Sequence, residues 1–576
     1  MRSGLGGVAL GALVSLACGR LKPAAADGGS SVPTPAATVP TADARPAVAP
    51  PADATAPADV PPALDTAVPR AGRELPAGVH PPVRFADGSA LLMGNGPDAC
   101  THQTPPSSDG HRWCAFTLGA AVGGVADLWV LDVTRAATGD APRCDGTDPG
   151  CIHLTDRVVT HSATLFDGDT LIFGTDSLSG SSPDFLGRFN AWRPGWSTGR
   201  QISSEMGFTC IGNRHSAAAA CLDDPAGTSS ERDSANVRVG YLARETGDPL
   251  PSLGRYPLRN GSDVHWQADL SPDGSVFALS DADTVGAAQT LRVAPTSTIG
   301  QAAPSLAIDD VFEWQISNDG QRIYFLRGPS QKADLYVADF PSGANARLVD
   351  AGVNMFRLLG DRPEDQAVEI WKIPPTAAGA IELLTDLGAA PKTIFSYNDF
   401  LNGAIVSPDL RYTTWLDEEF RGVLLRNSDL QACTIGEGGD NREVYDPAYL
   451  DASGLMFWKE RAGADPNSDF RDGFFARPET CTQKTRFARN VDRIAPIGDR
   501  GVVFTDEMDM TARATLKYVA VAPGGATLDP AGPVRVQESV LAPFVLVGDN
   551  PPLLVYAAKG ATAETSGLFV FGPVPF

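Results

Sequence analysis

The sequence predicts an all-β fold, and three observations lead to that prediction. The chain has 576 residues, of which 59 are Gly and 47 are Pro, and both types are poor interior residues for a helix. Apolar residues make up 43 % of the chain and aromatic residues 8 %, as in a globular protein. Short segments of alternating apolar residues recur between Asp-Gly turns. These features favour a large, turn-rich protein built from strands.

The charge of the chain limits its partners. The formal net charge is −23 at pH 7. Such an acidic chain repels phosphate groups, which argues against nucleic acid and against an anionic membrane surface as main partners. No run of about 20 apolar residues follows the N-terminal segment, so the sequence predicts no transmembrane helix.

Residues 1–17 have the features of an export signal, because Arg2 precedes an apolar stretch that ends directly before Cys18. A small residue before a cysteine resembles the lipobox of bacterial lipoproteins, which implies that Cys18 is lipidated. Ser15 and Leu16 depart from that pattern, and an ordinary cleaved secretion signal is the alternative. The resemblance implies an outer-membrane lipoprotein of a bacterial envelope that faces the periplasm or the cell surface.

Residues 18–80 are interpreted as a linker. This stretch is mostly Ala, Pro, Thr, Val and Asp, a composition that cannot bury a core and favours an extended chain. We expect it to act as a spacer between a lipid anchor and a folded head at residues 81–576. A head of that length is too long for one undivided core.

The eight cysteines after Cys18 are predicted to form disulfides, since an even number in an exported chain indicates bridges. Zinc is the weaker alternative, because there is no Cys-x-x-Cys pair and no histidine at zinc-finger spacing. The turn residues within 144–151 make that bridge the most specific of the four. The predicted pairs are Cys100 with Cys114, Cys144 with Cys151, Cys210 with Cys221, and Cys433 with Cys481.

Internal repeats explain how such a long head folds. Residues 266–279 and 312–325 each read as a strand, a tight Asp-Gly turn and a second strand. The segments 126–132 and 333–339 match as third strands and differ at only two positions. Related turns recur along the head, at Asp109, Asp167, Asn213, Asp273, Asp319, Gly360, Asp409, Ser453, Asp499 and Asp549.

The spacing of these ten turns predicts a β-propeller. They span 440 residues in nine intervals, close to 49 residues per unit, which is the length of a four-stranded antiparallel blade. A blade cannot bury both faces alone, so blades stack around a ring. We expect one ring of seven or eight blades with insertions between residues 81 and 260, with extra hairpins or a second ring as the alternatives.

Two of the turns also carry a family resemblance. Ser271–Gly274, followed by an apolar strand, and Ser407–Asp409 resemble the Ser-Pro-Asp-Gly repeat of TolB-like, WD-type β-propellers. The resemblance implies a fold and not a reaction, because that family includes scaffolds and the non-catalytic halves of peptidases.

The pattern after the first of these turns predicts which side chains meet each neighbouring blade. We expect Phe277 and Leu279 on one face of the blade, and Val276 and Ala278 on the opposite face. The turn at residues 318–320 is expected one blade further around the ring. Tryptophans within predicted strands are interpreted as core between blades, namely Trp129, Trp371, Trp415 and Trp458.

The search for catalytic residues finds weak candidates. Gly195–Gly199 matches the Gly-x-Ser-x-Gly nucleophile elbow, but no helical pattern follows it, so Ser197 is interpreted as a turn residue. His161 and His265 precede turns on strands that would line a central channel, where a histidine cluster is the alternative to a structural role.

Oxygen-bearing side chains are concentrated in three loops. Asp145 and Asp148 lie in one of them, and residues 417–419 are interpreted as an acidic hairpin tip without the carboxylate spacing of a glycosidase. The third loop lacks the Gly and Glu of an EF-hand, so the choice is between a looser calcium loop and a solvated acidic loop. Its candidate ligands are Asp465, Asn467, Asp469 and Asp472.

We therefore interpret the chain as a non-catalytic, envelope-anchored β-propeller that binds a protein or a cell-wall component and requires no cofactor. The alternative is a propeller hydrolase or lyase that acts on a sugar or a lactone at the mouth of the channel. A convergence of His, Asp and Glu side chains on one point would favour the enzyme.

Overall fold

The computed structural model describes the head of the chain. It covers residues 78–574 except for the segments 86, 88, 90–98, 101–109, 123–124, 140, 160–164, 168–169, 176–186, 204–206, 213–216, 229–230, 243–244, 258–267, 282–288, 297–305, 318, 330–331, 360–366, 373–378, 385–389, 398–404, 407–410, 417–421, 430, 436–443, 450–454, 462–470, 478–483, 498–499, 508–512, 523–526, 549–551 and 563–564. The expected signal at 1–17, Cys18 and most of the expected linker lie outside these residues. Within the described part, the α-helix is α2 (Val133–Ala137), and no helix has the length and apolarity needed to cross a membrane.

The first half of the head forms three large sheets. The first sheet contains two four-stranded repeats: β2 (Ala99–Cys100), β3 (Trp113–Val122), β4 (Val125–Asp132) and β6 (Cys151–Val159), then β7 (Leu165–Asp167), β8 (Thr170–Thr175), β9 (Arg188–Trp192) and β10 (Arg200–Gln201). The second sheet has one repeat: β11 (Gly207–Gly212), β12 (Ala218–Thr228), β13 (Glu231–Tyr241) and β14 (Ser252–Pro257). The third has seven strands: β15 (Ala268–Leu270), β16 (Val276–Asp281), β17 (Gln289–Pro295), β18 (Leu306–Ile316), β19 (Arg322–Arg327), β20 (Ala333–Asp339) and β21 (Arg347–Val353).

The second half of the head continues the same pattern. Three four-stranded sheets follow: β22 (Met355–Leu359), β23 (Ala367–Lys372), β24 (Gly379–Leu384) and β25 (Lys392–Tyr397); β26 (Ile405–Val406), β27 (Tyr412–Leu416), β28 (Gly422–Arg426) and β29 (Gln431–Ile435); β30 (Val444–Tyr449), β31 (Met456–Arg461), β32 (Arg471–Ala476) and β33 (Thr485–Ala488). The last sheet contains β34 (Arg493–Ile497), β35 (Gly501–Asp506), β36 (Arg513–Ala520), β37 (Val534–Val547), β38 (Leu553–Lys559) and β39 (Ser566–Phe571). Two short strands, β1 (Arg84–Phe85) and β5 (Arg143–Cys144), pair separately.

Two long strands each serve two neighbouring repeats. The first half of β18 pairs with β17 and its second half pairs with β19, and Val311 takes part in both pairings. In the same way β37 pairs first with β36 and then with β38. A strand shared in this way joins two four-stranded repeats into one continuous sheet.

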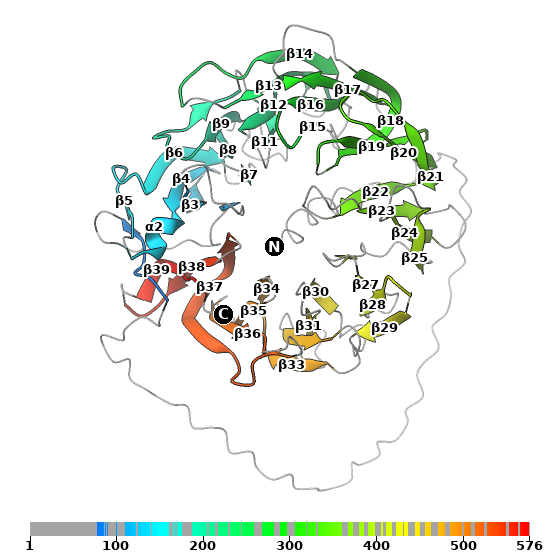
Figure 1. Ribbon diagram of the computed structural model, residues 1–576. Coiled ribbons are helices and arrows are strands. Elements are labelled where there is room, and N and C mark those ends of the chain that lie inside the picture. Colours follow the sequence, from blue (N-terminus) through cyan, green and yellow to red (C-terminus); the bar gives the residue numbers. More distant parts are fainter. Residues whose placement is uncertain are drawn as a thin grey trace, which may run out of the picture. The chain divides into compact units, whose positions relative to one another are not determined.

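The head is a β-propeller whose sheets follow one another around a ring in chain order (Figure 1). The described residues hold seven sheets of four or more strands, which agrees with the expected seven or eight when continuous sheets are counted. The same sheets contain ten four-stranded repeats. This number matches the ten turns found in the sequence and not the seven or eight blades expected from them. The two counts differ because shared or paired strands fuse neighbouring repeats in three of the sheets. Each of the ten turns lies in the segment from the first to the second strand of one repeat.

Burial on both faces of each sheet agrees with the strand patterns. Phe277 and Leu279 pack with side chains of β12 and β13, whereas Val276 and Ala278 pack with side chains of β18 and β19. The predicted opposite faces of β16 are therefore confirmed. The segments 126–132 and 333–339 are the third strands of their repeats, as predicted.

The last repeat is completed by the N-terminal segment. Val79 pairs with Phe571 and Val83 with Leu568 in antiparallel bridges, and His80 Nε2 lies 2.8 Å from the Gly572 carbonyl oxygen. The assignment of residues 78–80 to the linker is therefore wrong, because these residues cover the outer edge of β39. A composition rich in Ala and Pro does not reveal a strand whose partner lies at the opposite end of the chain.

Candidate functional site

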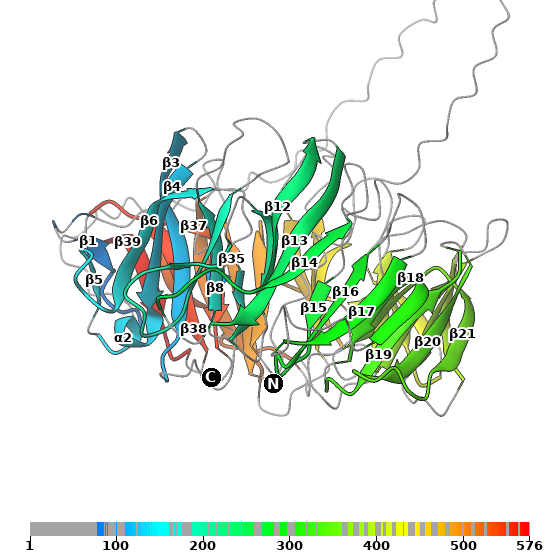
Figure 2. The same ribbon diagram turned by 90° about the horizontal axis from the view of Figure 1, so that it is seen from above.

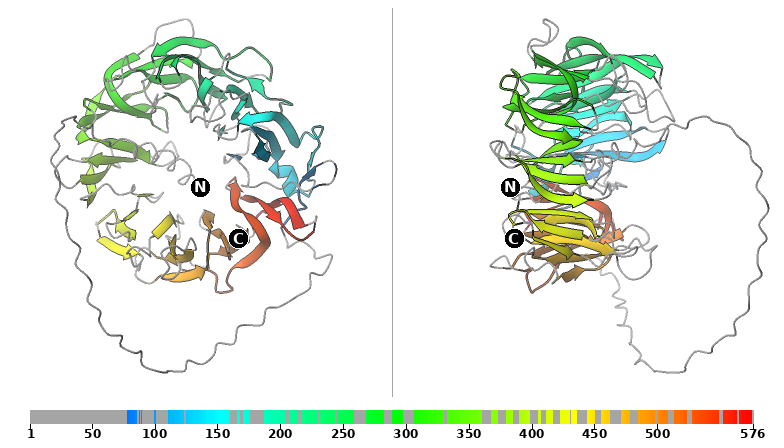
Figure 3. Two further views of the ribbon diagram at one scale, coloured as in Figure 1. Left: turned by 180° about the vertical axis from the view of Figure 1, so that it is seen from behind. Right: turned by 90° about the vertical axis from the view of Figure 1, so that its right-hand side faces the viewer.

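Two hairpins extend beyond their sheets and form the candidate interaction surface. The pairing of β12 with β13 continues through Ala226, Gly227 and Thr228, past the last β11 pair at Asp223. The β3–β4 pairing likewise reaches Val122. Figure 2 shows both hairpins projecting on the same side of the ring, and the right panel of Figure 3 shows the same arrangement. We call these two ribbons the projecting hairpins.

The base of the β12–β13 hairpin is fixed by a disulfide. Cys210 in β11 and Cys221 in β12 are directly opposite each other, and their Cα atoms are 4.1 Å apart. Cys221 is fully buried, and its side chain packs in the core between the second and third repeats. The bridge therefore holds the inner edge of the hairpin to the sheet.

A buried carboxylate also holds the two strands of this hairpin together. Asp223 is fully buried, and its Oδ2 accepts a hydrogen bond of 2.6 Å from Arg238 Nε. Its Oδ1 accepts a 2.9 Å bond from Asn236 Nδ2. Arg238 also donates to the Leu250 carbonyl oxygen at 2.7 Å, which links the hairpin to the segment before β14. A buried charge of this kind is stable only when it is fully paired, so the base of the hairpin has one arrangement.

The strand bends just beyond this carboxylate. The pairing register of β12 shifts between Asp223 and Ala226, and Asp224 has a φ of 49°, in the left-handed region. Asp is one of the few residue types other than Gly that tolerate this region. Arg255 of β14 forms an ion pair with the Asp224 carboxylate and donates to its carbonyl oxygen at 2.9 Å. The bulge therefore directs the rest of the ribbon away from the sheet.

Sequence reasoning missed the projecting hairpins, although the turn spacing contains a signal for them. The intervals from Asp109 to Asp167 and from Asn213 to Asp273 are 58 and 60 residues, compared with an average close to 49. These two intervals contain the β3–β4 and β12–β13 hairpins. The expected insertions between residues 81 and 260 thus include extra length within second and third strands.

Ser197 has the structural role that was expected of it. Its hydroxyl donates to Glu245 Oε1 at 2.6 Å, and the same oxygen accepts bonds from the backbone N–H groups of Ser197 and Thr198. These bonds, led by the Ser197 hydroxyl, lower the pKa of Glu245. The residue is part of a hydrogen-bonded turn after β9.

The predicted histidine positions at the channel, His161 and His265, lie outside the described residues. Among the described histidines, His111 Nδ1 is 2.5 Å from Oδ2 of Asp132, which is only 2 % exposed. The other oxygen of Asp132 accepts the N–H of Arg135 at 3.0 Å and thereby caps α2. The Asp132 carboxylate thus orients the His111 ring and is also the N-cap of α2. We therefore interpret this pair as structural.

The acidic loop candidates have structural partners wherever the structure describes them. Asp145 Oδ1 accepts bonds from the Thr147 hydroxyl and backbone, and these bonds lower the pKa of Asp145. Asp148 accepts hydrogen bonds from Arg135 Nη1 at 2.7 Å and from the backbone N–H groups of Arg143 and Gly150. Asp472 accepts a 3.1 Å bond from Arg486 Nη1. The remaining calcium candidates Asp465, Asn467 and Asp469, and residues 417–419, lie outside the described residues.

A metal centre is not formed within the described part of the chain, where no three His, Cys, Asp or Glu side chains gather in a suitable group. Charged side chains around β23 form ion pairs. Arg357 Nε lies 2.7 Å from Oε2 of the fully buried Glu369. Lys372 lies between Asp350 and Glu382, at 2.7 and 3.1 Å. These pairs link neighbouring strands and blades.

Three predicted disulfides are confirmed, namely Cys100–Cys114, Cys144–Cys151 and Cys210–Cys221. Cys433 in β29 is also disulfide-bonded, while Cys481, its predicted partner, lies outside the described residues. The expected role of tryptophan in the core is confirmed for Trp129, Trp371 and Trp458, which are buried, whereas the Trp415 side chain is outside the described part.

Comparison with known proteins identifies no family. No protein-family model matches the chain, and no curated protein matches it in sequence. A eukaryotic initiation factor structure has 7 % identity and a TM-score of 0.44, and covers 71 % of this chain and 93 % of its own. Dipeptidyl peptidase 4 of Porphyromonas gingivalis has 10 % identity and a TM-score of 0.40, over 82 % of this chain and 65 % of its own. The β-propeller domain of the trilobed protease from Pyrococcus furiosus has 14 % identity and a TM-score of 0.27, over 51 % and 91 %.

Proposed function

We propose that the chain is an envelope-anchored lipoprotein of the TolB-like propeller type, which binds a protein or a cell-wall component through its projecting hairpins. The carrying observation is the β12–β13 ribbon, whose base is held by a disulfide and by the buried Asp223 network. A hairpin fixed at its base loses little conformational freedom when it binds, and this preorganisation favours affinity.

The acidity of the chain narrows the chemistry of the partner. With a net charge of −23, the head attracts basic surfaces over distances of about one Debye length, roughly 8 Å at physiological salt. Electrostatic complementarity of this kind mainly raises the association rate. We therefore expect the partner to be a basic protein surface or a cationic cell-wall component, with binding that weakens as salt rises.

The test is capture of partners from solubilised bacterial envelopes by the full chain and by two variants. In the first variant, residues 225–234 are replaced by Asn-Gly, which closes the ribbon with a tight turn. In the matched control, residues 373–378 between β23 and β24 are shortened in the same way. Loss of the captured component with the first variant alone supports the proposal.

Two other results would contradict it. Equal capture by all three proteins would show that the ribbon is not the binding element. Turnover of model glycosides or lactones by the purified head would favour the hydrolase or lyase alternative, and a partner-binding role would then no longer be the main function.

A further inference from the structure

The ring closes at a seam between its first and last repeats. One core cluster joins buried side chains of β3 and β4 to side chains of β38 and β39, although these strands lie at opposite ends of the head. Residues 78–85 run across this seam, and we call them the closing strap. Val83 of the strap is fully buried in the cluster.

The strap contacts both ends of the ring. Its first part covers β39: the N–H groups of His80 and Val83 donate to the carbonyl oxygens of Val570 and Leu568, at 3.0 and 2.9 Å. The Gly572 N–H donates back to the Gly78 carbonyl oxygen at 3.0 Å. The second part is β1, which pairs in parallel with β5 next to the first repeat.

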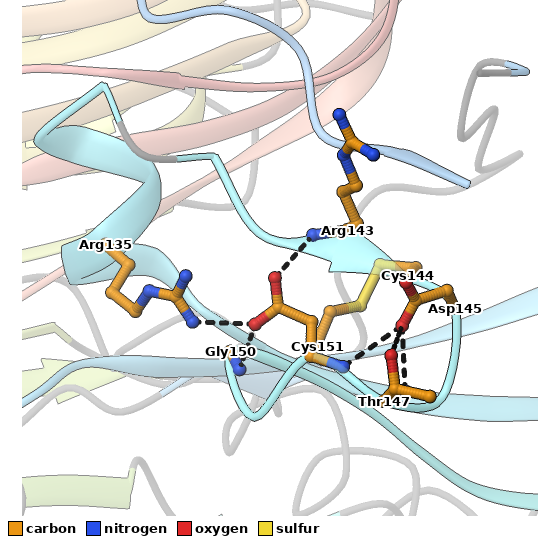
Figure 4. The surroundings of a disulfide bond; sticks show 8 residues. Arg135, Arg143, Cys144, Asp145, Thr147, Gly150 and Cys151 are labelled. Carbon is orange, nitrogen blue, oxygen red and sulfur yellow. Dashed lines mark hydrogen bonds and ion pairs between the residues drawn. A yellow bond between two sulfur atoms is a disulfide. The ribbon is translucent and has the colours of Figure 1, made fainter. Parts of the chain in front are cut away.

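The attachment of β5 is the unusual feature of the seam. Among the described strands, β5 pairs only with β1 and belongs to none of the blade sheets. Cys144 of β5 is instead joined covalently to Cys151 at the start of β6 (Figure 4). Asp148 adds a 3.0 Å bond from the Arg143 N–H. The disulfide thus adds a cross-link between the partner strand of the strap and the first blade, beside the backbone that already connects β5 to β6.

The other two described bridges have a different position. Cys100 lies opposite Cys114 in the β2–β3 pair, and Cys210 lies opposite Cys221 in the β11–β12 pair. These bridges connect strands that backbone hydrogen bonds already hold together. Their loss should leave the strand order of the ring unchanged.

We propose that closure of the ring depends on oxidation of Cys144 and Cys151, so that the strap docks stably only when this disulfide is present. In the bridging reaction the two thiols lose two protons and two electrons to a small-molecule disulfide, which is reduced to two thiols. The bridge fixes β5, and β5 then holds one end of the strap while β39 holds the other. Such a ring closes in an oxidising compartment and stays loose at its seam in a reducing one.

Hydrogen exchange of the full chain tests this proposal. The test variant carries Cys144→Ser and Cys151→Ser, and the matched control carries Cys210→Ser and Cys221→Ser. We expect the seam amides of His80, Val83 and Gly572 to exchange at least ten times faster in the test variant. Amides of β19 and β20, far from the seam in the chain, should keep their wild-type rates in both variants.

The same data can overturn the proposal. Seam amides that exchange at the wild-type rate in the test variant would show that the strap closes without the bridge. An equal loss of protection in β19 and β20 would show general destabilisation rather than opening of the seam. A second measurement uses reduced, refolded wild-type protein: adding oxidised glutathione should restore slow exchange at the seam, and failure to do so would also refute the dependence on oxidation.

Discussion

Two turns in adjacent repeats are built from the same hydrogen bonds, which shows how single residues define the repeat. In one turn the Ser271 hydroxyl donates to Asp273 Oδ1 at 2.6 Å and accepts the Val276 N–H at 3.0 Å. In the other, the Ser317 hydroxyl donates to Asp319 Oδ1 at 2.5 Å and accepts the Arg322 N–H at 2.9 Å. The predicted relation of the two turns by one repeat is thus confirmed at the level of individual bonds.

Gly320 gives a prediction about this turn. Its φ is 66°, and a Cβ atom at this position would lie 2.9 Å from Cδ of Pro272 in the neighbouring turn. Gly352 has a φ of 69°, and an added Cβ atom there would meet open space. A substitution of Gly352 therefore measures backbone strain without steric crowding. We expect Gly352→Ala to lower the free energy of unfolding by about 1–2 kcal/mol through backbone strain. Gly320→Ala should lower the free energy of unfolding by about 1–3 kcal/mol more than Gly352→Ala, because the added methyl group crowds Pro272. Urea denaturation measures both values. Equal losses would show that the two turns do not press on each other.

Glu313 of β18 gives a prediction about pH. Burial raises the pKa of Glu313 to about 8 from the ordinary value of 4.5. The folded chain therefore binds this proton more tightly than the unfolded chain, and the group lowers stability as pH rises from about 4.5 to about 8. The Glu313→Gln variant lacks this titration. Its free energy of unfolding should exceed that of the wild type increasingly between pH 5 and pH 9. A constant difference between the two proteins over this range would contradict the raised pKa.

At the scale of elements, the projecting β12–β13 hairpin contains two adjacent acidic residues in opposite environments. Asp223 is fully buried against Arg238, whose side chain is 17 % exposed. Asp224 and Arg255 are 54 % and 41 % exposed. The first pair has little water to replace a lost partner, whereas the second is solvated and screened by salt.

This difference predicts the outcome of two matched substitutions. Asp223→Asn leaves the Arg238 guanidinium without its buried countercharge. We expect this substitution to lower the free energy of unfolding by about 3 kcal/mol. Asp224→Asn keeps a residue type that tolerates a positive φ and should cost less than about 1 kcal/mol. Denaturation midpoints of the two variants provide the comparison. Similar costs would mean that the Asp223 network does not hold the base of the hairpin.

At the scale of the whole molecule, the chain is expected to have a lipid anchor, an extended linker and a ring. Cys18→Ser removes the predicted site of acylation, and each buried CH2 group of a lipid chain contributes about 0.8 kcal/mol to membrane binding. We therefore expect most of the variant in the soluble fraction after cell fractionation, and the wild type in the membrane fraction. A variant that still sediments with membranes in high salt would show that Cys18 is not the anchor.

The sequence alone determined the features that depend on residues close together in the chain. The alternation after Ser271–Gly274 correctly predicts which faces of β16 are buried, because side-chain direction in a strand follows from a period of two. Turn residues between Cys144 and Cys151 bring the two sulfurs together locally. The ten turns each mark the start of one four-stranded repeat, since each repeat begins with the same short hairpin, although only seven or eight blades are expected from the sequence.

Only the tertiary structure decided the features that depend on distant residues. His80 contacts Gly572 across 492 positions, and no local pattern marks either residue as part of a closing strand. The sharing of β18 and β37 between repeats depends on how far each strand continues past its first partner. The same holds for the ribbon beyond Asp223, because its projection depends on where β11 and β14 end. Ring closure and the candidate site are thus set by the meeting of strands from separate repeats, which the pattern within one repeat does not specify.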